Sequence, residues 1–255
     1  MSGYVEGRIR AQREWAAGLA TLTVAAEIEP FEPGQFVNLA LRLDASGQPS
    51  SAGSIVHRSY SIASAPGSPL EFLVTRVAGG AFTPALFDRP VGESLLVESK
   101  PQGFFRLSYV PETARELWMI ATGTGLGPYV SMLRTETTWA RFERFVVVHG
   151  ARLRAHLSHR DELEAASHAH GDRLSYVPLV SREDPMGGLA GRIPSAIESG
   201  EVEARAKLTL SADRSHVLLC GNPDMIQDTT RTLGARGLRK HRPRAPGHVS
   251  FEKYW

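Results

Sequence analysis

Cysteine, excess charge and long apolar runs are all scarce in this sequence. Cys220 is the single cysteine among 255 residues, which excludes an intramolecular disulfide and a thiolate-ligated iron–sulfur cluster, since each needs several cysteines. Lys and Arg number 29 and Asp and Glu 27, so the net charge is +2 and does not favour nucleic acid as a partner. No apolar run approaches the ~18 residues that a membrane span needs, and the N-terminus shows no signal-peptide pattern. We expect a cytoplasmic globular protein that binds neither nucleic acid nor a membrane.

The first hundred residues have the pattern of an all-β domain. Residues 19–24 alternate apolar side chains with Thr or Ala, as a half-buried strand does, and Pro33-Gly34 and Pro66-Gly67 mark turns. Six short strands at this spacing predict an antiparallel barrel or sandwich. The predicted strands cover residues 5–13, 19–27, 35–43, 57–63, 70–77 and 94–99.

The fourth of these strands carries an unusual set of side chains. Because strand residues alternate, Arg58, Tyr60 and Ile62 share one face. An Arg fork suits phosphate oxygens, and a Tyr ring suits stacking on a flat group. The strand therefore fits a ligand with phosphates and a flat ring. The alternative is an edge strand with a solvated Arg and a half-buried Tyr.

A glycine-rich turn follows the fifth strand at Gly79-Gly80. Thr83 before Pro84 predicts a helix N-cap with Pro at the first helical position. Free N–H groups and the helix dipole at such a turn favour phosphate. The alternative is a capped connecting helix that binds nothing.

Beyond Pro111 the pattern changes to strands alternating with helix-length segments. Such alternation predicts a parallel sheet covered by helices, with ligands at the carboxyl ends of its strands. We therefore expect a second domain over residues 109–255, after a first domain over residues 1–108. The predicted strands cover residues 117–121, 145–149, 174–181 and 217–220, and the predicted helices start at 128 or cover 160–167, 194–203 and 224–236.

Two strand ends in this second domain indicate a dinucleotide. The turn at residues 121–128 has the spacing G-x-G-x-G-P, with glycines that let a backbone approach a pyrophosphate and Pro128 to start a helix. The next strand ends at Arg152 and lacks the acid that would bind a ribose 2′-hydroxyl. Arg182 and Arg192 near other strand ends also suit a 2′-phosphate, although a single surface Arg is usually only solvated.

Three further features lie towards the C-terminus. Cys220 opens the run Cys-Gly-Asn-Pro-Asp-Met, and by composition alone it is a small buried residue. Residues 236–244 carry a basic run that fits either a solvated loop or a surface for an acidic partner. The chain ends on Tyr254-Trp255, an aromatic pair where termini are normally polar.

Taken in order, these motifs resemble the bacterial-type ferredoxin (or flavodoxin)-NADP reductases, in the subclass with a C-terminal Trp. The resemblance covers the whole chain and implies a six-stranded antiparallel FAD-binding barrel followed by a parallel-sheet NADP-binding domain, whose C-terminal tail returns to the FAD. It implies that Arg58 holds the FAD pyrophosphate, Tyr60 stacks on the isoalloxazine and Ser61 approaches the flavin N5. Cys220 would lie beside the nicotinamide. The further cofactor-binding residues that it implies are Leu73, Val74, Thr75, Gly80, Ala81, Phe82 and Thr83 for FAD, Thr124, Gly125, Arg152, Arg182, Arg192 and Asp224 for NADP, and Tyr254 and Trp255 covering the flavin cofactor.

The resemblance also implies the reaction. NADPH would donate a hydride to FAD, and the electrons would pass singly to ferredoxin or flavodoxin, with the protein acting as a monomer without a metal. Ser61, Cys220 and Tyr60 would be the residues nearest the chemistry. The alternatives are a free flavin reductase, an oxygenase-reductase component on the same fold, and a non-catalytic flavin-binding subunit.

Overall fold

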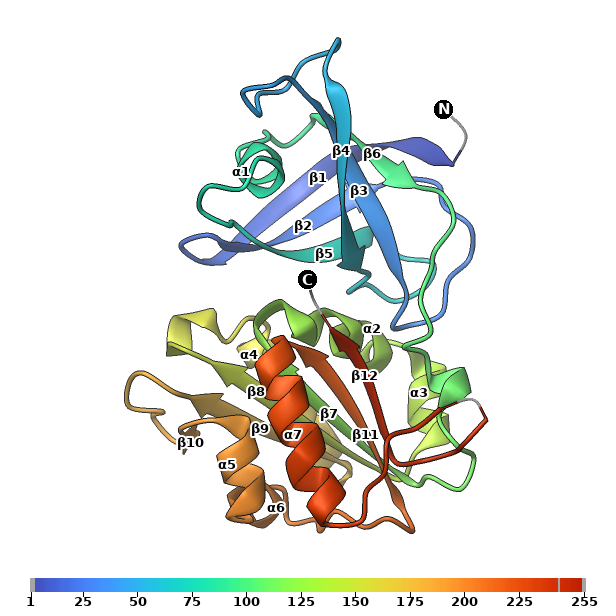
Figure 1. The fold of residues 1–255 in the computed structure, drawn as a ribbon, viewed down its shortest axis with the longest axis vertical. Coiled ribbons are helices and arrows are strands. Elements are labelled where there is room, and N and C mark those ends of the chain that lie inside the picture. The colour runs from blue at the N-terminus through green and yellow to red at the C-terminus, as the bar shows by residue number, and fades with distance from the viewer. Residues whose placement is uncertain (1–2, 243, 254–255) are drawn as a thin grey trace. The chain divides into compact units, whose positions relative to one another are not determined.

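The computed structural model describes residues 3–242 and 244–253, which form two compact units (Figure 1). The first unit contains the chain up to Arg106 and also Gly127–Thr135, while the second contains Leu107–Leu126 and the chain from Glu136 onward. The sequence predicts a single boundary between residues 108 and 109, whereas the contacts return a short segment to the first unit after the second has begun.

The first unit is built on a six-stranded antiparallel sheet with the strand order β4-β3-β6-β1-β2-β5. Beyond strand β4, the pairing of Ile62 with Phe72 of β5 joins the two ends of the sheet, so it closes on itself at this point. The inward-facing side chains, among them Leu22, Leu39 and Val97, form one buried apolar core. The strands are β1 (Tyr4–Ala16), β2 (Leu19–Ala25), β3 (Phe36–Leu43), β4 (Ser54–Ser61), β5 (Leu70–Thr75) and β6 (Ser94–Glu98).

Two helices complete the first unit. Helix α1 (Phe82–Phe87) follows β5 and buries Phe82 and Leu86. Helix α2 (Gly127–Leu133) packs on this unit, and its Tyr129 ring lies 6.0 Å from that of Phe105.

The second unit is a parallel sheet with the strand order β10-β9-β8-β7-β11-β12. Its strands are β7 (Glu116–Thr122), β8 (Arg144–Ala151), β9 (Leu174–Val180), β10 (Leu189–Ala190), β11 (Ser215–Gly221) and β12 (Val249–Lys253). Successive strands β7, β8 and β9 lie in one direction across the sheet, whereas β11 lies on the other side of β7. The order in which strands are added to the sheet therefore reverses between β7 and β11. Open α/β sheets bind ligands at the carboxyl ends of the strands at such a point.

Helices cover both faces of this sheet (Figure 1). Helices α5 (Ile193–Glu198), α6 (Glu201–Ala206) and α7 (Pro223–Ala235) bury one apolar cluster against Trp118, Val146 and Leu219. Helix α3 (Glu136–Arg141) supplies Trp139 to Phe145, on the opposite face of β8. Helix α4 (Arg160–His170) follows β8, and short 3₁₀ turns lie at Leu107–Tyr109, η2 (Gly123–Leu126), Arg154–His156 and Gly171–Arg173.

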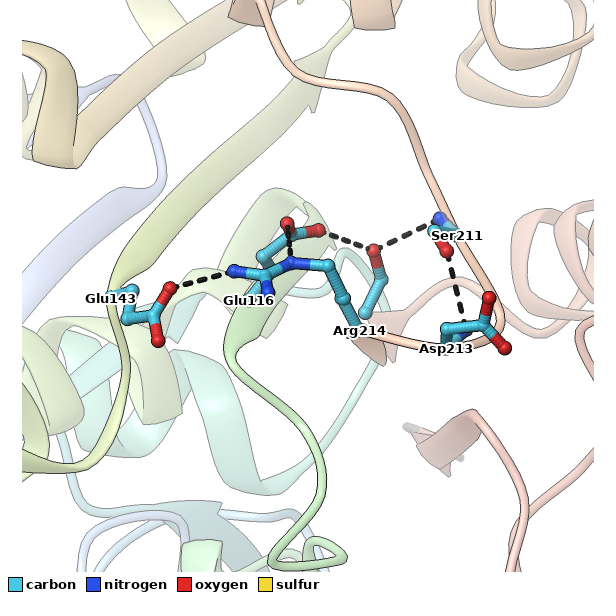
Figure 2. Close-up of polar contacts among 6 residues, drawn as sticks. Glu116, Glu143, Ser211, Asp213 and Arg214 are labelled. Carbon is cyan, nitrogen blue, oxygen red and sulfur yellow. Dashed lines mark hydrogen bonds and ion pairs between the residues drawn. The ribbon is translucent and has the colours of Figure 1, made fainter.

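A polar cluster joins three strands at the amino-terminal edge of the parallel sheet (Figure 2). The guanidinium of Arg214 donates to Glu116 at 3.0 Å and to Glu143 at 2.6 Å. Ser215 donates to the other oxygen of Glu116 at 2.7 Å and accepts from the backbone N–H of Ser211. This cluster lies at the end of the strands away from the predicted ligand site, so we assign it to stability.

Several local predictions need correction. The helix predicted over residues 194–203 is two helices, because Gly200 adopts φ 80° between α5 and α6 and breaks the helical backbone. Thr83 is not an N-cap, because α1 begins at Phe82, two residues before the predicted start at Pro84. The Thr83 hydroxyl accepts instead from the N–H of Val77 at 2.9 Å. Helix α3 and strands β10 and β12 are additions that the patterns do not predict.

Candidate nucleotide-binding sites

Strand β4 presents an open edge in the first unit. It pairs with β3 from Ser54 to Ser61, and within the described residues no strand pairs with its other edge between Ser54 and Tyr60. Arg58 is exposed on this strand, and among the described residues its guanidinium donates only to the neighbouring carbonyl of His57, at 2.7 Å. Free backbone groups and an exposed guanidinium therefore lie along one line, as an extended phosphate ligand requires.

The Tyr60 ring links this strand to the start of helix α1. Its ring centroid lies 6.3 Å from that of Phe82 and 6.5 Å from that of Phe72. Burial raises the pKa of the Tyr60 phenol far above its ordinary value, with the Arg58 charge opposing only part of the increase. Tyr60 therefore stays protonated and can donate a hydrogen bond. The structure thus brings together Tyr60 and Phe82, two predicted site residues 22 positions apart in the sequence.

The other predicted residues of this unit differ in exposure. Ser61 is only 6% exposed, and Leu73 and Val74 are buried in the sheet. Leu73 and Val74 can reach a ligand only through their backbone, whereas Thr75 is exposed. Gly80 and Ala81 line an open depression of about 430 Å³ beside the loop at Ser46–Pro49. Gly80 and Ala81 therefore line an open surface and not a closed cavity.

In the second unit, the turn after β7 and the turn after β11 meet at the point where the strand order of the sheet reverses. A β-carbon on Gly125 would lie 2.4 Å from the carbonyl oxygen of Cys220, and one on Gly221 would lie 2.4 Å from the hydroxyl of Thr122. Both positions therefore require glycine. The Thr122 hydroxyl also accepts from the N–H of Asn222 at 2.9 Å, so the turn after β7 and the turn after β11 form one rigid surface.

Asn222 also caps the helix that follows this surface. Its side-chain oxygen accepts from the N–H groups of Asp224 at 2.9 Å and Met225 at 3.1 Å, and Pro223 occupies the first helical position. Asn222 and Thr122 are the residues that sequence reasoning missed. Asn before Pro is an N-cap signal that could have identified the first, whereas only the packing of the two turns reveals the role of the second.

Three arginines follow strand ends on the same carboxyl edge of the sheet. The exposed residues Arg152, Arg182 and Arg192 lie just after β8, after β9 and before α5. A backbone hydrogen bond of 3.0 Å from Arg182 to Arg152 holds the first two segments together. In the part of the chain that the structure describes, no carboxylate pairs with these guanidinium groups, whereas Arg154 beside them pairs with Glu183. Three uncompensated positive charges suit a phosphate.

The remaining predicted site residues lie on β11, in the first turn of α7 or outside the described residues. Cys220 is fully buried at the end of β11, which fits a positioning role rather than that of a nucleophile. Asp224 is exposed in the first turn of α7, where its charge suits a hydroxyl better than a phosphate. Tyr254 and Trp255 lie outside the described residues. The described residues contain no group of three or more His, Cys, Asp or Glu that could hold a metal ion, and no helix among them is long and apolar enough to cross a membrane.

Comparisons with known proteins identify the family to which the chain is similar. Residues 119–231 match the family described as the oxidoreductase NAD-binding domain. Over its whole length the chain is 40% identical to the flavodoxin/ferredoxin–NADP reductases of Escherichia coli and Shigella flexneri, and it covers all of each. Its fold matches a crystal structure of a ferredoxin NADP+ reductase from Neisseria gonorrhoeae with bound FAD and NADP, with a TM-score of 0.91, 26% identity and full coverage of both chains.

Proposed function

Because the chain belongs to the flavodoxin/ferredoxin–NADP reductase family, we propose that it binds FAD and NADPH and passes electrons from NADPH to a one-electron carrier, ferredoxin or flavodoxin. It is an oxidoreductase with the two-sheet fold of that family. Bound FAD would supply the chemistry that converts a hydride from NADPH into single-electron transfers. The protein contributes binding, orientation and electrostatics. The observation that carries the proposal is the set of three exposed arginines, without carboxylate partners among the described residues, on the same carboxyl edge of the sheet as the glycine turn.

The first unit fits FAD. We assign the FAD pyrophosphate to Arg58 and to the segment formed by Gly80, Ala81, Phe82 and Thr83. Tyr60 offers a protonated phenol and a ring beside Phe82, and we assign it to orienting the isoalloxazine, with Ser61 hydrogen-bonding near the flavin N5. The backbone of Leu73, Val74 and Thr75 would line the other side. We assign Tyr254 and Trp255 to covering the cofactor.

The second unit fits NADPH. We assign the pyrophosphate to the turn that contains Thr124 and Gly125, and the 2′-phosphate to Arg152, Arg182 and Arg192. Cys220 ends the strand beside that turn, and we assign it to placing the nicotinamide ring. Asp224 then binds a hydroxyl of the same nucleotide. In these terms the FAD-binding domain covers residues 1–108 and the NADP-binding domain residues 109–255.

The electron carrier would meet a positively charged surface. Arg239, Lys240, Arg242 and Arg244, which we call the basic segment, are all exposed, and among the described residues no carboxylate pairs with them. Uncompensated charge of this kind attracts an acidic protein and speeds its association. We propose that the basic segment helps to dock an acidic carrier, and that the enzyme works as a cytoplasmic monomer.

An anaerobic experiment tests the proposal. The purified protein should contain FAD, and NADPH should bleach its absorbance much faster than NADH does. Arg192→Ala should raise the NADPH concentration needed for half-maximal rate by about tenfold, as loss of a charge-assisted hydrogen bond predicts, and leave the rate with NADH nearly unchanged. Equal bleaching by NADPH and NADH would contradict the arginine assignment and favour a flavin reductase. Absence of bound flavin would overturn the assignment of Arg58, Tyr60 and Ser61.

A further inference from the structure

The pairing between β7 and β11 ends where the two turns of the second unit begin. The last paired residues of these strands are Ala121 and Cys220. Just beyond this pair, the Thr122 hydroxyl accepts a hydrogen bond from the backbone N–H of Asn222 at 2.9 Å. A side-chain oxygen therefore continues the connection between the two strands past their last paired residues and into the turns that follow them.

Gly221 leaves the space that this hydroxyl occupies. Its φ is 125°, a conformation that glycine adopts easily and other residues rarely do. A β-carbon on Gly221 would lie 2.4 Å from the hydroxyl oxygen of Thr122 and 2.6 Å from its carbonyl oxygen. The Thr122 hydroxyl and the bare backbone of Gly221 therefore fit one another, and the turn after β11 lies directly against the end of β7.

Asn222 extends this connection into helix α7. Its backbone N–H donates to Thr122, while its side-chain oxygen accepts from the N–H groups of Asp224 and Met225. Met225 is buried in the apolar cluster of the second unit. The Thr122 hydroxyl is thus bonded to a residue that the helix and the core already hold, so this bond fixes the turn after β11 to the end of β7.

The methyl group of Thr122 lies towards a different strand. Thr122 is paired with Gly150 of β8, and a β-carbon on Gly150 would lie 3.3 Å from the Thr122 methyl carbon. The hydroxyl therefore contacts the turn after β11, whereas the methyl group packs towards the strand that leads to Arg152. Because the two groups have separate partners, the hydroxyl can be removed while the packing against β8 is retained.

From these contacts we infer that Thr122 is a positioning residue for the bound dinucleotide. This inference rests on the proposed function, in which the turn of Thr124 and Gly125 binds the pyrophosphate and Cys220 places the nicotinamide ring. By fixing the turn after β11 against the glycine turn, the Thr122 hydroxyl makes one preformed surface for these two parts of the cofactor. Recognition of the 2′-phosphate, which we assign to three arginines, does not depend on this bond. Thr122 acts through the backbone of the turn and needs no contact with the cofactor.

The two groups on Thr122 allow a matched pair of variants. Thr122→Val removes the hydroxyl and keeps the branched shape, whereas Thr122→Ser keeps the hydroxyl and removes the methyl group. The probes are NADP+, which contains every part of the nucleotide, and adenosine 2′-phosphate, which lacks the pyrophosphate and the nicotinamide. In titration calorimetry of the FAD-loaded protein, Thr122→Val should raise the dissociation constant of NADP+ about fivefold, as loss of one hydrogen bond predicts, and leave that of adenosine 2′-phosphate unchanged. Thr122→Ser should bind both probes as the unmodified protein does.

Amide hydrogen exchange gives a readout that does not depend on the nucleotide. The N–H of Asn222 should exchange faster in Thr122→Val than in Thr122→Ser, because only the Ser variant retains the acceptor. The control is Thr230→Val, since the Thr230 hydroxyl donates to the carbonyl of Ile226 at 2.6 Å within α7. This control loses a threonine hydrogen bond elsewhere in the same unit, and it should leave both dissociation constants and the exchange of Asn222 unchanged.

Three results would overturn the inference. An equal loss of affinity for both probes in Thr122→Val would make the hydroxyl a general stabilising contact. An equal loss of NADP+ affinity in Thr122→Val and Thr122→Ser would assign the effect to packing. Faster exchange of Asn222 without any change in NADP+ affinity would show that the bond does not position the nucleotide.

The same measurements separate this inference from the proposed function. If neither probe binds to the unmodified protein, the proposed function itself fails, while the exchange of Asn222 still shows whether the Thr122 hydroxyl holds the turn after β11. Should Thr122→Val fold poorly, Thr122→Ala compared with Thr122→Ser tests the loss of the hydroxyl between two variants that both lack the methyl group.

Discussion

At the scale of single residues, His149 is a buried polar group that the proposed chemistry does not use. It is fully buried on β8, and its Nδ1 lies 3.3 Å from the hydroxyl of Tyr176. Its Nε2 has no hydrogen-bond partner among the described residues. Burial, with a smaller contribution from His159, lowers the pKa of His149 from 6.5 to about 3, so the folded protein keeps this ring neutral.

This depressed pKa predicts acid sensitivity. The unfolded chain takes up a proton at His149 below its unfolded pKa of 6.5, whereas the folded chain does so only near 3. Stability is therefore fully present above pH 6.5 and falls progressively as the pH drops towards 3. At pH 5 the loss from this residue is about 2 kcal/mol relative to pH 7. Urea unfolding of His149→Gln should show a difference between pH 7 and pH 5 that is smaller by this amount, and an unchanged difference would contradict the assignment.

The sequence predicts a residue's place in a site where that place depends on neighbouring residues in the chain. Arg58, Tyr60 and Ser61 follow one another on a strand, and Gly125 lies in a turn whose spacing is visible in the sequence. The sequence does not show that Gly125 and Gly221 each pack against the other's turn, because these positions are far apart in the chain. It also misplaces Thr83, whose hydroxyl binds Val77 rather than the helix that follows.

At the scale of elements, the polar cluster of Glu116 joins the starts of three parallel strands (Figure 2). Glu116 is 5% exposed and accepts from both Ser215 and Arg214. Glu143 at the start of β8 accepts from Arg214 as well. The carboxylate of Glu116 therefore links the starts of β7 and β11 through side-chain hydrogen bonds.

Glu116→Ala should destabilise the protein by about 2 kcal/mol, because the buried hydroxyl of Ser215 then loses its acceptor. Glu116→Gln retains an acceptor oxygen and should cost less. Denaturant unfolding of both variants at pH 7 measures the difference, and flavin reduction by NADPH serves as the control because the cluster lies at the opposite end of the strands. Equal stability of the Ala variant and the unmodified protein would show that the cluster does not stabilise the sheet.

Most elements follow from local patterns, and the exceptions have physical reasons. The strands of both sheets were predicted from alternation, apolar runs and turn residues, with ends that shift by up to three residues. The break between α5 and α6 depends on the positive φ of Gly200, which a helical pattern does not reveal. Strand β12 has only five residues, and its pairing with β11 joins positions far apart in the chain, which a local pattern does not reveal.

At the scale of the whole molecule, a net charge of only +2 conceals an uneven distribution. The basic segment gathers four exposed positive side chains within six positions. Lys240 also lies 4.2 Å from the ring of Phe251, and Lys253 lies 5.7 Å from the same ring. This surface therefore combines positive charge with one aromatic group, and its charge is available to a partner.

Reversing two of these charges tests whether the surface docks the carrier. Arg239→Glu with Lys240→Glu should raise the carrier concentration for half-maximal turnover by about tenfold at low salt, and the effect should shrink as salt screens the charges. Reduction of a small acceptor such as ferricyanide should not change. The control Arg10→Glu with Lys100→Glu alters the net charge equally at exposed positions elsewhere. If turnover and its salt dependence are the same in both double variants, the basic segment does not dock the carrier.

The placement of α2 limits how this enzyme can be recombined. Gly127–Thr135 packs with the first unit although it follows the first strand of the second. A single crossover near residue 108 would therefore separate Ser131 from the Ser64 carbonyl and Arg134 from Glu71, which they contact within that unit. A chimera of two relatives would therefore need three junctions, near residues 106, 126 and 135. Parents that are identical over this nine-residue segment should tolerate a single junction, whereas parents that differ in it should yield less stable hybrids, because these contacts would be lost.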